Sequence, residues 1–276
     1  MGDGVRHKAA LMEEMTVADV IRALGTTRTV IIPIGGTEQH GHHLPLSTDS
    51  VMAEFIARGV SQRTGCVVAP CVSYSHSYGT LPGTTNIQPS TLTQVLVDIA
   101  VSLHEQGFSI VIIYPCHLEA STLYAARDAE AQLQPKLPRA RVLVYTTSST
   151  PAEAQGMLDV EVDGHAGAGE TSVMLHIAPH MVRAERPYDG RERWWLGVVA
   201  ELHQLDESGV DSQKRMRFVP PEDVLAAVRD AEPKHCPIKY GVFGDPNKAD
   251  PEFARIVCEH QIEEFAKFIR ELESRP

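Results

Sequence analysis

Short runs of β-branched residues alternate with longer amphipathic segments, and this alternation constrains the fold of the 276-residue chain most strongly. The runs are apolar along almost their whole length, which is typical of strands buried on both faces of a sheet. The predicted strands are 29–34, 66–69, 109–114 and 140–145, and the predicted helices are 17–24, 49–61, 90–106, 120–133, 170–177 and 251–273. Because parallel strands need helical crossovers, the alternation predicts an α/β layered fold with a largely parallel sheet.

Capping residues and glycines mark several of the predicted boundaries. Thr16 is expected to cap the first helix and Gly25 to stop it, while Ser90 is expected to cap a later helix that Gly107 ends. A long loop rich in Gly, Pro and Ser follows the second strand and runs to about residue 89. A loop of this length inside a compact domain is more often functional than a mere connector.

Composition and charge exclude several classes of function. A hydrophobic content of 43% and a charged content of 22% are ordinary for a soluble globular enzyme. The net charge of −11 argues against binding to nucleic acid or to an anionic membrane surface, both of which attract Lys and Arg. No stretch reaches membrane-spanning length, and the N-terminus lacks an apolar signal region. The five scattered cysteines include no CxxC pair, so we expect a cytoplasmic protein in a reducing compartment.

Side chains that can bind metal follow the first and third predicted strands. The five candidates are Glu38, His40, Asp49, His117 and Glu119. Residues two apart in an extended segment share a face, so we expect Glu38 to project with His40, and His117 with Glu119. Open α/β sheets bind their ligands at the carboxyl ends of the strands. Mixed imidazole and carboxylate donors suit Zn²⁺ or Mn²⁺, and Asp49 as a bridge would give each of two ions about three protein ligands.

Some of these residues and their neighbours also have a plainer explanation. Asp49 alone would serve as the N-cap of the following helix, a role worth roughly 1 kcal/mol. His42 and His43 suit surface or supporting positions, and a lone His117 suits a satisfied core histidine. Cys116 suits a small buried residue better than a thiolate ligand or nucleophile. The joint pattern favours the metal site, because chance does not readily place Glu-x-His and His-x-Glu at two strand ends.

Four motifs resemble those of the creatininase (creatinine amidohydrolase) family. They are the segment 33–49, Leu-Pro-Gly-Thr-Thr at 81–85, His-Ala-Gly-Ala-Gly-Glu-Thr-Ser at 165–172 and Gly-Val-Phe-Gly-Asp-Pro at 241–246. Their order and spacing are similar to the family's over about residues 15 to 270. The resemblance implies one three-layer α/β/α domain over residues 1–276, with a mostly parallel central sheet. It also implies a homo-oligomer, often a hexamer, that hydrolyses small cyclic or linear amides.

The same resemblance implies the ligands of two divalent ions, Zn and/or Mn, with Fe as an alternative. Glu38, Asp49 and His117 would hold one ion, and His40, Asp49 and Glu119 would hold the other. A water between two such ions loses much of its proton affinity and can attack a carbonyl as hydroxide.

Proton transfer needs a further group, because an amide anion is a poor leaving group. His165 matches the histidine that the family uses here, and an imidazole titrates near neutrality. Glu119 and Glu170 complete the candidate catalytic set. Glu170 has an equally good explanation as an acidic residue in the first turn of a helix, where the helix dipole stabilises it.

The residues around the candidate site depart from the family pattern. Ser75 and His76 resemble positions that line the family's substrate pocket, although a merely solvated loop would explain them nearly as well. The segment 115–120 lacks both asparagines that often flank the second ligand cluster, and Leu118 stands where a creatininase has tyrosine. Glu161 replaces a tryptophan of the creatininase pocket. We therefore count Ser75, His76 and Leu118 as substrate-binding candidates and expect a substrate other than creatinine.

The sequence thus predicts a dinuclear metal-dependent amidohydrolase that cleaves a C–N bond in a small cyclic amide or formamide-like substrate. One alternative is a ring-opening hydrolase of a lactone or activated ketone that uses the same metal site. A peptidase with an open pocket and a non-catalytic metal-binding homologue are further alternatives. Trp194 and Trp195 could form a lid, a subunit contact or a surface anchor.

Overall fold

A five-stranded, fully parallel sheet forms the centre of the protein, with the strand order β1-β3-β2-β4-β5. The computed structural model describes residues 7–77, 82–146, 150–160, 163–188 and 241–274. The strands are β1 (Ala10–Leu11), β2 (Thr29–Ile34), β3 (Val67–Val68), β4 (Ile110–Pro115) and β5 (Arg141–Val144). The two longest, β2 and β4, pair over their full length and are buried at every residue, as their almost wholly apolar sequences predict.

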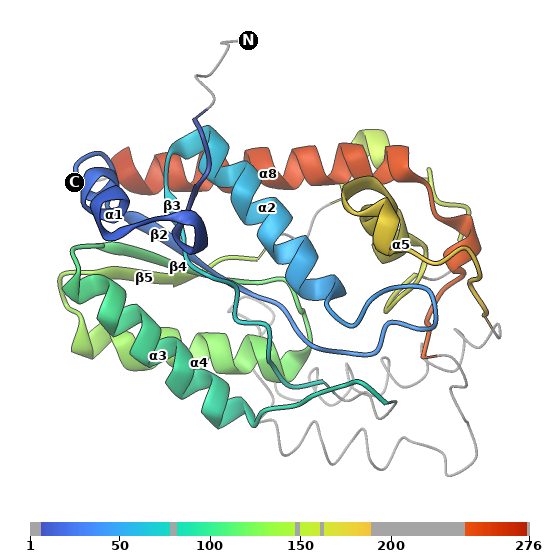
Figure 1. Cartoon of the computed structure of the whole chain (residues 1–276), viewed down its shortest axis with the longest axis horizontal. Coiled ribbons are helices and arrows are strands. Elements are labelled where there is room, and N and C mark those ends of the chain that lie inside the picture. The colour runs from blue at the N-terminus through green and yellow to red at the C-terminus, as the bar shows by residue number, and fades with distance from the viewer. Residues whose placement is uncertain (1–6, 78–81, 147–149, 161–162, 189–240, 275–276) are drawn as a thin grey trace, which may run out of the picture.

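Helices cover both faces of this sheet (Figure 1). The α-helices of the described residues are α1 (Val17–Leu24), α2 (Thr48–Thr64), α3 (Pro89–Glu105), α4 (Ala120–Lys136), α5 (Ala168–Ile177) and α8 (Pro251–Ser274). Short 3₁₀ helices lie at Met12–Glu14, Ala152–Ala154, Pro179–Met181 and Pro246–Lys248. In Figure 1, α2 and α8 lie on one side of the sheet and α3 and α4 on the other. The predicted three-layer α/β/α architecture is confirmed.

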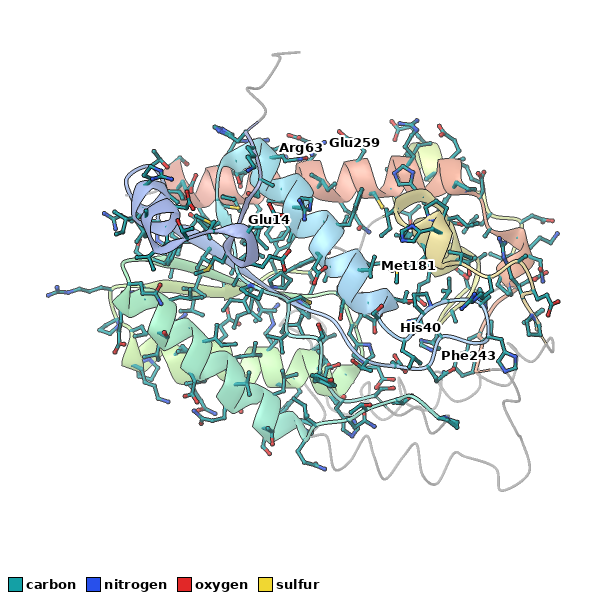
Figure 2. The ribbon with its side chains drawn as sticks, in the orientation of Figure 1. Glu14, His40, Arg63, Met181, Phe243 and Glu259 are labelled. Atoms are coloured by element: carbon teal, nitrogen blue, oxygen red, sulfur yellow. The ribbon has the colours of Figure 1, made fainter. Side chains whose placement is uncertain are left out.

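Alternate residues of β2 belong to two different cores. Val30 and Ile32 pack with apolar residues of α3 and α4, whereas Ile31 packs with residues of α2 and α8. Successive side chains of a strand point to opposite faces, so a strand covered on both sides must be apolar throughout. Arg63 near the end of α2 also pairs with Glu259 of α8, as Figure 2 shows.

Most predicted boundaries hold to within a few residues. The first helix begins after Thr16 and ends at Gly25, as expected, and the Thr16 and Asp19 side chains form a reciprocal capping box. The prediction that Ser90 caps its helix is wrong. That helix already begins at Pro89, with Gln88 at the N-cap position, because proline is preorganised for the first helical turn.

The second helix bears directly on the metal hypothesis. It begins at Thr48 with Ser47 at the N-cap position, so Asp49 lies inside the first turn and is not the cap. The plainer explanation of Asp49 is therefore wrong. The residue is only 3% exposed, and burial without a capping role points to a different use for this carboxylate.

Some predicted features differ from the structure or lie beyond the described residues. The β1 strand has two residues and was not predicted, and β3 is shorter than the predicted 66–69. Such short segments carry too little pattern to be recognised from sequence. Glu161, Trp194 and Trp195 lie outside the described residues. Among the helices that are described, none combines the length and apolarity that crossing a bilayer requires.

Candidate metal centre

The candidate ligands meet at the carboxyl edge of the sheet, beside the start of α2. Figure 2 shows His40 in the loop next to this end of α2. Gly35 and Gly36, directly after β2, let that loop approach the helix closely. A Cβ on Gly35 would lie 2.5 Å from the backbone N of Ser50, and a Cβ on Gly36 would lie 2.9 Å from Asp49 Oδ2. Only glycine fits these two positions without displacing the helix.

One group of ligand atoms consists of Glu38, Asp49 and His117. His117 Nδ1 lies 2.9 Å from Asp49 Oδ2 and 3.4 Å from Glu38 Oε2. All three residues are buried, with at most 4% of their surface exposed. Their candidate ligand atoms all lie within 4.8 Å of one another, close enough to surround a single cation.

A second group shares the Asp49 carboxylate. His40 Nε2 lies 3.5 Å from Asp49 Oδ1 and 3.6 Å from Glu170 Oε2. Asp49 therefore presents one oxygen to each group, which is the geometry of a bridging ligand. Glu170 is the third member, where the family resemblance implied Glu119.

His165 approaches the same cluster from the loop before α5. Its Nδ1 lies 3.8 Å from Glu38 Oε2, and its ring centroid lies 4.3 Å from that of His40. Glu38, His40 and His165 form the third group of possible ligands among the described residues. Glu38 and His40 thus lie together, as their spacing predicts.

A backbone carbonyl fixes one ring nitrogen of each histidine. His40 Nδ1 lies 3.1 Å from Glu38 O, His117 Nε2 lies 3.1 Å from His76 O, and His165 Nε2 lies 2.6 Å from Gln39 O. A carbonyl only accepts hydrogen bonds, so each of these nitrogens must carry a proton. The other nitrogen of each ring faces the acidic cluster and is available for a cation or a proton. Metal-binding histidines are oriented in this way in many proteins.

Two buried atoms of the cluster are left without a hydrogen-bond partner in the part of the chain that the structure describes. They are Glu38 Oε2 and His40 Nε2. An unsatisfied buried polar atom costs roughly 1–3 kcal/mol, and more when the group is charged. A cation bound between them would satisfy both atoms. The donor set of imidazoles and carboxylates therefore fits two divalent ions of the zinc or manganese type.

The acidic surroundings change the protonation of these residues. Burial disfavours the charged imidazoles, but contacts with Asp49 and the nearby carboxylates outweigh it. They raise the pKa of His40 to about 9 and that of His117 to about 10. Burial alone would raise the pKa of Asp49, yet His117 and His40 hold it well below its usual value. Without a cation, this cluster holds protons that a metal would have to displace.

The remaining candidates occupy distinct places around the cluster. Ser75 and His76 are buried beside it, and the His76 carbonyl is the group that orients His117. Leu118 is 52% exposed, an unusual position for a leucine next to a buried ligand. Glu119 is the N-cap residue of α4 and belongs to none of the three groups found among the described residues. Its charge nevertheless contributes to the raised pKa of His117.

Desolvation of the half-buried Cys116 bears on its two explanations. It raises the pKa of the Cys116 thiol well above its usual value. A protonated thiol is a poor nucleophile and a poor metal ligand, which favours the small buried residue.

Sequence reasoning missed two residues that support the site. Ser77 donates a hydrogen bond to Glu38 Oε1, and the Gln39 carbonyl accepts one from His165. Gln39 lies between two predicted ligands, but the alternation rule considers side chains and gives no role to its main chain. Ser77 lies in the long loop that was predicted to be functional, although no motif singled it out.

A sequence profile of the creatininase family, described as creatinine amidohydrolase, matches residues 13–269. The chain belongs to the creatininase family. This match covers every candidate ligand and the three-layer fold that positions them.

Individual relatives of this creatininase-family chain differ in their named activities. It is 34% identical to the mycofactocin precursor peptide peptidase of Mycolicibacterium smegmatis over 188 residues, which cover 65% of this chain and 68% of that protein. It is 29% identical to the 3-dehydro-scyllo-inosose hydrolase of Thermotoga maritima over 215 residues, which cover 74% and 66% of the two proteins. A crystal structure of creatinine amidohydrolase superposes with a TM-score of 0.72 at 21% identity, covering 98% of this chain and 100% of that one. The protein is thus a creatininase-family hydrolase with a buried candidate metal site.

Proposed function

We propose that this protein is a dinuclear metal-dependent hydrolase that cleaves a C–N bond next to a carbonyl group. The observation that carries the proposal is the shared Asp49 carboxylate, with a histidine held by a backbone carbonyl on each side of it. The solved creatininases of this fold include a Zn–Zn form and a Mn form, which supports the same metals here. Bound at this site, two such ions would lower the pKa of a water and polarise the substrate carbonyl.

The proposed ligands differ in one position from those that resemblance implies. Glu38, Asp49 and His117 would hold one ion, as expected. For the other ion we propose His40, Asp49 and Glu170, because Glu170 Oε2 lies 3.6 Å from His40 Nε2. Glu119, at the start of α4, stays a candidate for proton transfer or for a ligand position.

His165 is the proposed proton carrier. Its Nε2 proton is held by the Gln39 carbonyl, so Nδ1 faces the cluster with a free lone pair. That atom can accept a proton from the attacking water and pass it to the leaving nitrogen. The role suits an amide better than an ester, whose alkoxide leaves with less assistance.

A peptide substrate is the second candidate, and two observations favour it. The relative at 34% identity is named as a peptidase, and Leu118 and Tyr74 expose 52% and 50% of their surface in loops at the edge of the sheet where the candidate ligands lie. Exposed apolar side chains beside a buried polar site suit a substrate with an apolar portion. Ring opening of an activated ketone is a third candidate, supported by the inosose hydrolase relative.

A matched substrate panel tests the proposal. Protein loaded with Zn²⁺ or Mn²⁺ is assayed against formamides, lactams, short peptides and lactones of similar size. We expect turnover of an amide or peptide that is lost on chelation, with His165→Ala reducing amide cleavage by about 10² or more. Equal loss on matched amide and ester substrates, or activity that survives complete metal removal, would contradict the proposed mechanism.

A further inference from the structure

We propose that Gly241, Val242 and Phe243 form a clamp that positions His165 for proton transfer. The inference rests on the proposed function, in which His165 Nδ1 carries a proton. These three residues begin the Gly-Val-Phe-Gly-Asp-Pro motif, to which the metal chemistry gives no role. They come from a distant part of the chain and contact both loops that supply His40 and His165.

The first contact of the clamp is to the main chain of His165. The Phe243 N–H donates a hydrogen bond of 2.8 Å to the His165 carbonyl. The Phe243 ring also lies beside the imidazole, with 6.2 Å between the ring centroids. Figure 2 labels Phe243 and His40 at the same end of the molecule. The backbone of His165 is therefore anchored to the clamp.

The second contact is to Gln39, the residue whose carbonyl fixes the His165 imidazole. The Gln39 side chain is packed directly on Gly241, so a Cβ at Gly241 would overlap Gln39 Oε1. Gly241 also has a φ of 64°, in the left-handed region that favours glycine. Gln39 is buried, and its Oε1 accepts the Gly41 N–H at 3.2 Å. Any larger residue at 241 must displace Gln39.

The third contact interlocks the clamp with the loop after His40. Val242 is 4% exposed, and its Cγ2 lies 2.5 Å from the position that a Cβ on Gly41 would occupy. Gly41 has a φ of 66°. In each loop a glycine leaves room for a side chain of the other loop: Gly41 for Val242, and Gly241 for Gln39.

Together these contacts decide which nitrogen of His165 faces the carboxylates. The Gln39 amide nitrogen, which only donates, also lies 3.0 Å from His165 Nε2, so Gln39 offers that ring nitrogen both an acceptor (its carbonyl) and a competing donor (its amide). If the Gln39 main chain moves with its displaced side chain, the Nε2–carbonyl hydrogen bond of 2.6 Å is broken, and His165 loses the acceptor that holds its proton on Nε2. The clamp acts on His165 through Gln39 and is a positioning device rather than a catalytic group.

Gly241→Ala tests the clamp, with Gly156→Ala as the matched control. Gly156 has a similar φ of 76°, but among the described residues no atom beyond its chain neighbours lies within 4 Å of its Cβ position. Both substitutions therefore place an alanine at a similar positive φ, and only Gly241→Ala clashes with Gln39. The readout is the two-bond ¹H–¹⁵N correlation of histidine side chains in metal-free, ¹⁵N-histidine-labelled protein at a pH where an ordinary imidazole is uncharged. His165→Asn assigns the signal.

We expect wild type and Gly156→Ala to show His165 protonated at Nε2, and Gly241→Ala to lose that unique pattern. Val242→Ala leaves the backbone unstrained and should shift the same signal in the same direction, so it decides the question if Gly241→Ala does not fold. An unchanged His165 signal in every folded clamp variant overturns the inference. The measurement needs neither metal nor substrate, so it stands apart from any failure to find hydrolysis.

Discussion

At the scale of single residues, hydrogen bonds from neighbouring side chains orient the candidate metal ligands. Glu38 illustrates this, because its two oxygens have different surroundings. Oε1 accepts a hydrogen bond from Ser77, while Oε2 faces His117 and has no hydrogen-bond partner among the described residues. The serine keeps one oxygen occupied and so directs the other into the candidate metal position.

Ser77→Ala should therefore weaken both metal binding and the fold. We expect metal affinity to fall by about 10–100-fold, and the unfolding free energy to fall by about 1–3 kcal/mol because a buried carboxylate oxygen loses its partner. Titration with a chelator-buffered metal and thermal unfolding measure the two effects. Ser90→Ala, on the exposed side of α3, is the control and should change neither.

Glu170 and Glu119 compete for one ligand position, and metal content separates them. Glu170→Gln should reduce the bound metal by one ion per chain, because its Oε2 lies beside His40 Nε2. Glu119→Gln should keep both ions if its role is proton transfer. Elemental analysis of the two purified variants provides the comparison, and the opposite outcome would restore the ligand set that family resemblance implies.

At the scale of elements, the close crossing of α2 and α8 supports the layer behind the site. Gly59 of α2 faces Ile262 of α8, and a Cβ on Gly59 would lie 2.5 Å from Ile262 Cδ1. The helices can approach closely because Gly59 has no side chain, so Ile262 packs directly against its backbone. Asp49 lies on the same helix as Gly59, so the position of α2 also sets the position of the bridging carboxylate.

Gly59→Ala should overpack this crossing and lower the unfolding free energy by about 1–3 kcal/mol. Removing the colliding atom with Ile262→Val should recover part of the loss. Denaturant unfolding of the two single variants and the double variant gives the coupling between the positions. Strictly additive effects would show that the crossing is not the cause.

For the whole molecule, the raised histidine pKa values link stability to pH and to metal. The pKa of His40 rises from an ordinary 6.5 to about 9, and that of His117 to about 10. Groups whose pKa is raised by folding stabilise the native state fully below their unfolded pKa, and this contribution is lost as pH rises through the folded value.

Metal-free protein should therefore lose stability as the pH rises from about 6.5 toward 9. Metal-loaded protein should show the opposite trend over the same range, because a cation needs the neutral imidazoles and binds more tightly as they lose protons. Thermal unfolding with and without a chelator, at several pH values, measures both slopes. Parallel slopes would mean that these histidines do not bind the metal.

The homo-hexamer that resemblance implies stays a prediction, which light scattering can test.

Much of the fold could be predicted because its local patterns leave few alternatives. Strand β2 is apolar at every position after Thr29 and is followed by two glycines, so a buried parallel strand that ends at an open edge is the arrangement that fits. The spacing of Glu38 and His40 likewise placed two candidate ligands together, and the family motifs made the hydrolase assignment. These conclusions depend on residues close together in the chain.

Only the tertiary structure decided which distant groups meet at that edge. Glu170 faces His40, and the Gln39 side chain packs on Gly241, because loops far apart in sequence pack on one another there. The proton positions on His40, His117 and His165 follow from backbone carbonyls, which are present at every residue and leave no trace in the sequence. The sequence thus determined the sheet and the residue types of the candidate metal ligands. Which residues contact these ligands, and how the ligands are oriented, depends on long-range packing that no local pattern encodes.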